Sequence, residues 1–313
     1  MTNLSEFTFL SSDGKTQLHG MLWEPEGVAV RAVLQICHGV AEHIARYDGF
    51  ARALNEQGIV VAGHDHLGHG KSLPEGGTPV YFGQGSTWNT VVDDIYILHQ
   101  RLKQRYPDVP LCIMGHSMGS FLTRTYLIRY PGTVKAAVIM GTGWQPRAAI
   151  TGGLALANAI AAVSGENATS ELVTELAFGS YNKLFAPNRT KVDWLSADES
   201  NVDDYIADPL CGADATVGLF RQMLHGIRFN QRQSHLRQMD REMPVLFVAG
   251  DKDPVGNCGK GVRQTYDAFR AAGMRDCTLK LYPGLRHEIL NEKAYTADIT
   301  KNIEAWLLSR LEK

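Results

Sequence analysis

The stretch LCIMGHSMGS, residues 111–120, decides the fold because an apolar run turns there through two glycines around one serine. Residues 111–114 predict a short buried strand, since apolar residues follow one another without alternation. Residues 121–130 predict a helix that ends before Pro131. The sequence therefore places a tight turn between a buried strand and a helix.

The turn itself has the pattern G-x-S-x-G, which between a strand and a helix is typical of a nucleophile elbow. A serine on so sharp a turn has a strained backbone, and neighbouring chain passes close to Gly115 and Gly119, which have no Cβ to clash. The Ser117 hydroxyl then lies at a helix N-terminus, where backbone N–H groups favour negative charge. The pentapeptide alone also fits a glycine-rich turn capped by a serine, so the assignment needs catalytic partners.

Strands and helices alternate on both sides of this elbow. Apolar runs predict strands, and segments with helical periodicity lie between them. The expected strands are residues 7–10, 18–23, 32–37, 59–63, 111–114, 134–140, 245–249 and 277–282, and the expected helices are 47–57, 88–106, 121–130, 262–272 and 292–311. The alternation indicates an α/β fold with a mostly parallel, eight-stranded sheet and helices on both faces.

The alternation stops after residue 143, where the sequence becomes helical and irregular. An insertion at this point lies above the carboxyl edge of the sheet, where ligands bind in open α/β folds. We therefore expect a core of residues 1–143 and 243–313, with residues 144–242 as a helical lid. Residues 148–165 carry no charge, and their many small residues predict a helix that covers an apolar cavity or touches an interface, rather than a membrane span.

Charge and cysteine content limit the partners and the compartment. The 313 residues carry a formal net charge of −2, which argues against nucleic acid as the main partner. Four lid arginines fit a solvated helix face or a surface for anionic head groups: Arg228, Arg232, Arg237 and Arg241. Five cysteines without framework spacing predict a reducing, cytoplasmic compartment, and residues 1–15 lack the features of a signal peptide.

A serine hydroxyl needs a general base, and the base needs a buried acid that fixes its tautomer. In α/β enzymes with this elbow, the acid and then the histidine follow the serine along the chain. His287 fits the base because it lies on a loop just past the last strand. Asp251 and Asp253 both follow the preceding strand. Asp253 is favoured because Pro254 stiffens its turn, and Asp251 is expected to brace the loop.

A tetrahedral intermediate also needs two preorganised N–H donors. The amide of Met118, directly after the serine, is the first candidate. The second is expected from the loop after the strand at 32–37, where the amide of Val40 fits best. Gly39 allows this loop to approach a substrate closely, so it is a candidate substrate contact.

Several motifs along the chain resemble a known enzyme group. They are HGVAEHIARY at 38–47, GHDHLGHGKS at 63–72, GHSMGS at 115–120, GDKDPVG at 250–256 and GLRHE at 284–288, with DPLCG at 208–212 in the lid. Together they resemble the monoacylglycerol lipase and lysophospholipase group of α/β-hydrolases, within the serine aminopeptidase S33-type family. The first motif is the most specific, and the resemblance spans nearly the whole chain.

The resemblance implies a role for each matching residue. Ser117 is the nucleophile, Asp253 the acid and His287 the base, while the amides of Val40 and Met118 form the oxyanion hole. It implies no cofactor. Ser120 departs from the pattern, since many relatives have a second glycine there, and we expect activity to survive because that position packs the helix against the sheet.

Three clustered histidines could be mistaken for metal ligands. His64, His66 and His69 lie in a turn after a strand rather than on one helical face, and the sequence nearby offers no matching ligand set. We therefore expect no metal. The resemblance implies a structural role for the residues around them: Asp65, Gly68, Gly70 and Ser72.

Two groups of residues have open roles. His116 and Glu42 either line the catalytic gorge or are satisfied polar residues near the core. The apolar lid residues either hold an acyl chain or form the lid's own packing core: Leu154, Leu156, Ile160 and Val163.

These patterns predict a serine carboxylic-ester hydrolase that acts through an acyl-enzyme. The charge-free lid favours a small-molecule or lipid ester with one acyl chain, such as a monoacylglycerol or lysophospholipid, and transient, peripheral contact with a membrane interface. An acyltransferase or an aminopeptidase would use the same residues. A ligand-binding protein without turnover is disfavoured because serine, acid and histidine are all present.

Overall fold

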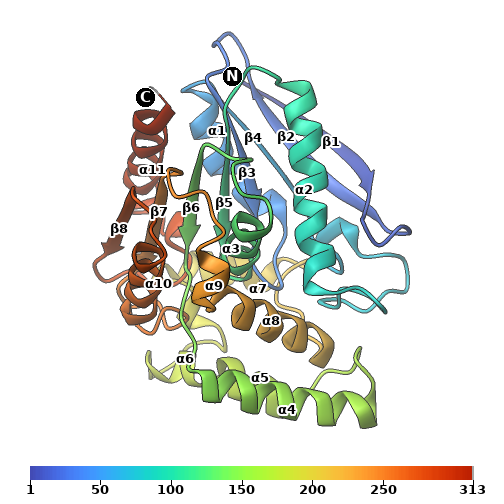
Figure 1. Cartoon of the computed structure of the whole chain (residues 1–313). Helices are drawn as coiled ribbons and strands as arrows, with labels where there is room; N and C mark the ends of the chain where they lie inside the picture. Colours follow the sequence, from blue (N-terminus) through green and yellow to red (C-terminus); the bar gives the residue numbers. More distant parts are fainter. Residues whose placement is uncertain (312–313) are drawn as a thin grey trace.

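The computed structural model of the chain describes residues 1–311 and confirms the α/β architecture (Figure 1). One eight-stranded sheet has the order β1-β2-β4-β3-β5-β6-β7-β8. Its strands are β1 (Thr2–Leu10), β2 (Gln17–Pro25), β3 (Ala32–Cys37), β4 (Ile59–His64), β5 (Leu111–His116), β6 (Ala136–Met140), β7 (Val245–Gly250) and β8 (Cys277–Tyr282). Strand β2 runs antiparallel to β1 and β4, and the remaining neighbours are parallel.

The central strands are buried on both faces, which explains why their sequences are apolar throughout. Successive side chains of a strand point to opposite faces of the sheet. Val33 and Ile113 belong to one core layer, whereas Leu34 and Met114 belong to the other. The sheet therefore separates two hydrophobic cores, and each core needs its own cover of helices.

Helices cover both faces, as predicted. The first core packs against α2 (Trp88–Arg105), α3 (Met118–Arg129) and α10 (Lys260–Ala271), which contribute Val91, Phe121 and Val262. The second core packs against α1 (Asp48–Asn55) and α11 (Thr296–Leu311), which contribute Leu54 and Ile299. A hairpin turn at Asp13 and Gly14 joins β1 to β2.

The helix after the elbow begins earlier than its sequence pattern indicates. The expected start at residue 121 is wrong, because α3 begins at Met118, directly after Ser117. The Ser117 carbonyl already accepts a hydrogen bond from the Ser120 N–H at 2.9 Å and another from the Ser120 hydroxyl at 2.6 Å. No linker separates the strand from the helix, so the serine stands at the helix N-terminus.

Between β6 and β7 the chain forms helices and irregular segments, with one isolated bridge between Thr169 and Thr216 among the described residues. The helices are α4 (Arg147–Ser164), α5 (Glu171–Thr174), α6 (Ser180–Lys183), α7 (Glu199–Ala207), α8 (Val217–Asn230) and α9 (Gln233–Leu236). Helix α4 packs on α8, and α8 packs on α3 of the core. Figure 1 shows α4, α5 and α6 beyond the carboxyl ends of the parallel strands. We propose that residues 144–242 act as one lid on a core of residues 1–143 and 243–313.

Helix α4 is unusually apolar and exposed for a lid helix. Over its 18 residues the mean hydropathy is 1.3, and only 17% of the helix is buried. By length and composition alone, the helix could therefore cross a membrane. Its buried face contains Ile150, Leu154 and Ala157, which pack in the first core. One helix of this kind is weak evidence for a span.

Candidate active site

Ser117 has the strained backbone that an elbow requires. Its φ is 53° and its ψ is −122°, a region that residues with a Cβ rarely adopt. Two glycines make the turn fit: a Cβ on Gly115 would collide with the Gly119 carbonyl, and a Cβ on Gly119 would collide with the carbonyl of Cys37. The close packing of β5, α3 and the end of β3 therefore fixes where the serine stands.

Asp253 and His287 are joined in the buried interior. The Oδ1 atom of Asp253 lies 3.0 Å from His287 Nδ1, and the two residues are 0% and 2% exposed. The N–H of Val255 donates to the same Oδ1 at 2.9 Å and holds the carboxylate in place. A carboxylate at this distance requires a proton on Nδ1, which leaves Nε2 of the neutral ring as an acceptor.

The second acid of the same loop has a different partner. Asp251 Oδ1 accepts a hydrogen bond from the Gly284 N–H at 2.8 Å, on the exposed side of the loop that carries His287. The structure thus brings Asp253, and not Asp251, to the histidine ring, while Asp251 braces the loop that holds it.

The other nitrogen of His287 is free. Nε2 is buried and has no hydrogen-bond partner among residues 1–311, Ser117 included. Ser117 and His287 line one cavity. The His287 ring packs against the rings of His116 and Trp194, with centroid distances of 4.7 and 5.2 Å. The ring therefore keeps an unpaired acceptor, and its residue lines the same cavity as the serine.

The predicted oxyanion donors are also free. Across the described chain, neither the Val40 nor the Met118 amide donates a hydrogen bond to protein. Both residues line the cavity at Ser117. The Gly39 amide, by contrast, donates to Glu42 Oε1 at 2.6 Å, and a Cβ on Gly39 would lie 3.1 Å from the Ser117 Cβ. Gly39 thus lets its loop approach the serine and leaves Val40 as the free donor.

An apolar cavity of about 450 Å³ opens at Ser117 under the lid. Leu156 lines it, whereas the predicted contacts Leu154 and Ile160 do not; Leu154 is buried in the packing core and Ile160 packs against it. The predicted charge-free segment, now α4, contributes further lining residues, and other lid side chains line the cavity without having been indicated by any sequence motif, among them Phe178, Tyr181, Trp194, Phe220 and Met223. The lid therefore supplies the walls of this cavity.

A second, more polar cavity of about 820 Å³ meets the first at Ser117. His116, Glu42 and Gly39 line it on the core side. Lys183 and Lys191 line it on the lid side. An ester whose carbonyl lay at Ser117 would thus have an apolar space on one side and a polar space on the other.

The clustered histidines near β4 are buried packing residues. His64, His66 and His69 are at most 3% exposed, and burial lowers the pKa of His64 to about 3 and that of His69 to about 4. Asp65 organises the turn, since its carboxylate accepts from the amides of Ile44 and Lys71 at 2.8 and 2.9 Å. The turn thus supports the neighbouring loop.

A different group has the residue types of a metal site. Potential ligand atoms of His43, Asp208 and Cys211 lie within 4.8 Å of one another. However, His43 Nε2 is already bonded to Asp208 Oδ2 at 2.8 Å. Burial raises the pKa of the Cys211 thiol, and a metal would require the thiolate. The donor set therefore fits a hydrogen-bonded contact between the core and the lid better than a metal site.

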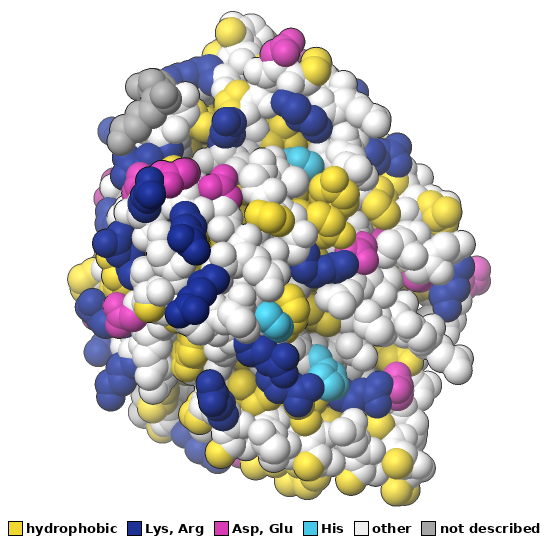
Figure 2. All heavy atoms as spheres, in the orientation of Figure 1, with side chains coloured by type: hydrophobic (Ala, Val, Ile, Leu, Met, Phe, Trp, Pro, Cys, Tyr) yellow, Lys and Arg dark blue, Asp and Glu magenta, His cyan; other side chains and the backbone are white. Residues whose placement is uncertain are grey.

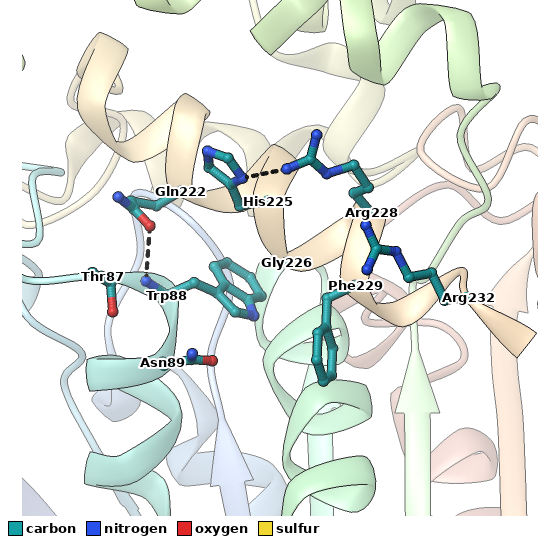
Figure 3. A pocket seen from close by; sticks show the side chains of 9 residues that line it. All are labelled: Thr87, Trp88, Asn89, Gln222, His225, Gly226, Arg228, Phe229 and Arg232. Carbon is teal, nitrogen blue, oxygen red and sulfur yellow. Dashed lines mark hydrogen bonds between the residues drawn. The ribbon is translucent and has the colours of Figure 1, made fainter. Parts of the chain in front are cut away.

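A separate surface pocket lies between the N-terminus of α2 and α8 (Figure 3). Gln222 accepts from the Trp88 amide at 3.0 Å, and Arg228 bonds to His225 at 3.1 Å. Arg228 and Arg232 line this pocket, all four predicted arginines are exposed, and Figure 2 shows basic side chains gathered over α8 and α9. Within residues 1–311 this pocket shares no lining residue with the cavities at Ser117, so we assign it no part in catalysis.

Comparison with known proteins agrees with this geometry. A monoacylglycerol lipase from Mycolicibacterium smegmatis is 31% identical over 98% of both chains. The human monoglyceride lipase is 28% identical, over 96% of this chain and 89% of its own length. A thermostable carboxyl esterase from Bacillus coagulans, solved in complex with glycerol, has a TM-score of 0.92 at 26% identity, covering 99% of this chain and 100% of that one.

The family model described as serine aminopeptidase, S33, matches residues 28–294. That range contains the elbow, the acid, the histidine and the whole lid. The chain belongs to the serine aminopeptidase S33 family and is an α/β-hydrolase enzyme.

Proposed function

We propose that the enzyme is a serine carboxylic-ester hydrolase that acts through an acyl-enzyme on lipids with a single acyl chain. The hydrogen bond between Asp253 and His287 carries the proposal, because it fixes a base whose Nε2 has no other partner and which lines the same cavity as Ser117. The relatives named monoacylglycerol lipase and carboxyl esterase support an ester of this class.

In the first half-reaction, the Ser117 side chain rotates toward Nε2 and its Oγ attacks the ester carbonyl. His287 takes the hydroxyl proton as the attack proceeds, and Asp253 stabilises the imidazolium that forms. The amides of Val40 and Met118 donate to the oxyanion. His287 then gives the proton to the departing alcohol, which leaves an ester between Ser117 and the acyl group.

Water completes the cycle by the same route. His287 accepts a proton from the water as the water attacks the acyl-enzyme, and the same amides stabilise the second tetrahedral intermediate. Collapse of this intermediate releases the fatty acid and returns the proton to Ser117. The polar cavity provides the path for both the alcohol and the water.

The two cavities support a substrate with one chain and one polar head. The apolar cavity of about 450 Å³ would hold the acyl chain, with Leu156 and Met118 among its walls. The polar cavity would hold a glycerol or glycerophosphate head group. We therefore favour monoacylglycerols and lysophospholipids over triacylglycerols, whose two further chains would have to occupy polar surroundings.

We also propose that the lid contacts a membrane interface transiently while the enzyme remains cytoplasmic. Helix α4 exposes most of its apolar length. Val163 is 88% exposed and Leu176, which lines the apolar cavity, is 66% exposed. Apolar side chains of this kind bind at the boundary of a bilayer, where a single-chain lipid could enter the cavity.

A substrate panel tests the proposal. Hydrolysis of p-nitrophenyl esters of increasing chain length is measured beside monoacylglycerol and lysophosphatidylcholine, with Ser117→Ala as the control. We expect turnover of single-chain esters that the alanine variant lacks. Ester transfer to an added alcohol in preference to water would show an acyltransferase instead, and release of N-terminal residues from peptides would show a peptidase.

A further inference from the structure

Glu42 is a buried carboxylate at the centre of an unusually dense set of hydrogen bonds. It is 3% exposed. Its Oε1 accepts from the Gly39 amide at 2.6 Å and the Tyr47 hydroxyl at 3.1 Å, and lies 3.2 Å from His116 Nδ1. Its Oε2 accepts from Arg46 at 2.9 Å. One side chain thus holds the loop that presents Val40 and also the residue directly before the serine.

Two routes lead from Glu42 to the loop that carries the base. Through His116, Nε2 lies 3.3 Å from the backbone carbonyl of His287. Through Arg46, the guanidinium forms two hydrogen bonds with Glu288, at 2.7 and 2.8 Å. Glu288 directly follows His287 in the chain. Glu42 therefore connects, through one intermediary on each route, the oxyanion loop and the base loop.

The geometry also decides the protonation of His116. One ring nitrogen faces the Glu42 carboxylate and the other faces the His287 carbonyl, and both of these groups only accept hydrogen bonds. Both nitrogens must therefore carry a proton, which makes the ring an imidazolium. Burial alone would lower the pKa of His116, but the bond to Glu42 and its charge raise it above its ordinary value.

The charges of the group agree with this assignment. The titratable groups that face His116 are Glu42, Glu288 and the ring of His287. With His116 charged, the buried group contains two anions and two cations: Glu42, Glu288, Arg46 and His116. A neutral His116 would leave one net negative charge in the interior, which is costly.

We propose that Glu42 is a positioning residue, which locks the oxyanion loop and the His287 loop to each other and holds His116 as an imidazolium beside Ser117. The proposal rests on the proposed ester hydrolysis. Buried ion pairs add little stability compared with apolar packing, so stability alone does not explain four paired charges at this place. The four charged residues instead contact two segments of the proposed active site. These segments are the Gly39 amide next to Val40 and the backbone carbonyl of His287.

Kinetics of Glu42→Gln test the positioning role. The matched control is Glu24→Gln on β2, because Glu24 also bonds an arginine and a tyrosine hydroxyl, those of Arg105 and Tyr106, but away from the site. With p-nitrophenyl butyrate we expect kcat to fall about 10-fold to 100-fold, with KM within about threefold, since small displacements of reacting groups cost rates of that order. Glu42→Asp, which keeps the charge, should recover part of the loss.

Each outcome separates the inference from the proposed function. If Ser117→Ala is inactive but Glu42→Gln matches Glu24→Gln in kcat, the positioning role is wrong while the ester hydrolase stands. If Ser117→Ala keeps full turnover, the proposed function itself fails. A loss in Glu42→Gln that tracks only the fraction of unfolded protein, measured by circular dichroism, would also overturn the inference.

A measurement on the unaltered enzyme tests the imidazolium directly, and a variant serves only to assign the signals. The enzyme is labelled with nitrogen-15 in its histidines, and the His116 ring signals are assigned by their loss in His116→Gln. We expect both ring nitrogens to be protonated at pH 7. A neutral His116 ring at that pH would overturn the assignment.

Discussion

Asp253 and His287 are 34 positions apart in the chain, and a hydrogen bond of 3.0 Å joins their side chains. The bond forms because β7 and β8 are parallel neighbours, so the loops that follow them meet at one edge of the sheet. Ser117 reaches the same edge from β5. The fold therefore converts three distant loops into one site, and the catalytic proposal depends on that convergence.

Separate replacement of Asp253 and Asp251 by asparagine should distinguish their roles. In Asp253→Asn, the ring of His287 loses the carboxylate that fixes its tautomer, so we expect kcat to fall on the order of ten-thousand-fold. In Asp251→Asn, the amide oxygen can still accept from the Gly284 N–H, so kcat should stay near the unaltered value. Steady-state hydrolysis of p-nitrophenyl butyrate decides the matter. Similar losses in both variants would contradict the assignment.

Added volume at the elbow should destabilise the fold. In Gly115→Ala the new Cβ meets the Gly119 carbonyl and the Thr123 hydroxyl, and overpacking of this kind costs about 1–3 kcal/mol. Gly49 lies in α1 with open space around its Cβ position, so Gly49→Ala is the matched control. Its free energy of unfolding should rise by about 0.5–1 kcal/mol. Urea denaturation measures both. Equal unfolding free energies of the two variants would show that the turn accommodates a Cβ atom at residue 115 without strain.

Two lid leucines should respond differently to substitution. Leu156 lines the apolar cavity, so Leu156→Trp should shorten the preferred acyl chain and lower turnover of long-chain esters about tenfold, as expected for lost apolar contact. Leu154 is 5% exposed in the packing core, and Leu154→Ala should instead cost about 2–5 kcal/mol of stability. Chain-length profiles and thermal melts distinguish the two effects. A changed profile in Leu154→Ala alone would reverse the roles.

The buried histidines predict acid sensitivity. Burial lowers the pKa of His64 to about 3, whereas the unfolded chain titrates near about 6.5. Between these values the unfolded state binds more protons than the folded state. The contribution of His64 to the free energy of unfolding is therefore at its highest above about pH 6.5 and decreases as the pH falls toward about 3.

His64→Phe should remove this sensitivity, because both ring nitrogens lack partners and phenylalanine has a similar shape. Below about pH 6.5, the free energy of unfolding of the variant should rise relative to that of the unaltered enzyme by about 1.4 kcal/mol for each unit by which the pH falls. Any packing cost of the larger ring is the same at every pH. Unfolding free energies in urea at pH 5 and pH 7 provide the measurement. A difference that does not change with pH would contradict the prediction.

The core elements could be predicted from the sequence because each has a strong local signal. The expected strands at 32–37 and 277–282 match the bounds of β3 and β8, and alternation of strands and helices predicts the mostly parallel sheet. The sequence pattern predicts too late a start for α3, because Met118 and Gly119 carry no helical periodicity, whereas the Ser117 carbonyl accepts the first hydrogen bond of the helix.

The lid could not be read in the same detail. Trp194 reaches the cavity from a short 3-10 helix (Asp193–Leu195) and Phe220 from α8, and their positions depend on contacts between α4, α8 and the core rather than on a local pattern. The same limit explains Glu42. Its motif is visible in the sequence, but the bonds to Gly39 and His116 that define its role are tertiary.

Detection of the acyl-enzyme tests the central claim most directly. Enzyme is mixed with p-nitrophenyl butyrate, quenched in acid within the first turnover and digested for mass spectrometry. The account predicts a butyryl group on the peptide that contains Ser117, formed with a burst of nitrophenol and absent in Ser117→Ala. A butyryl group on another residue, or a burst that persists in the alanine variant, would contradict it.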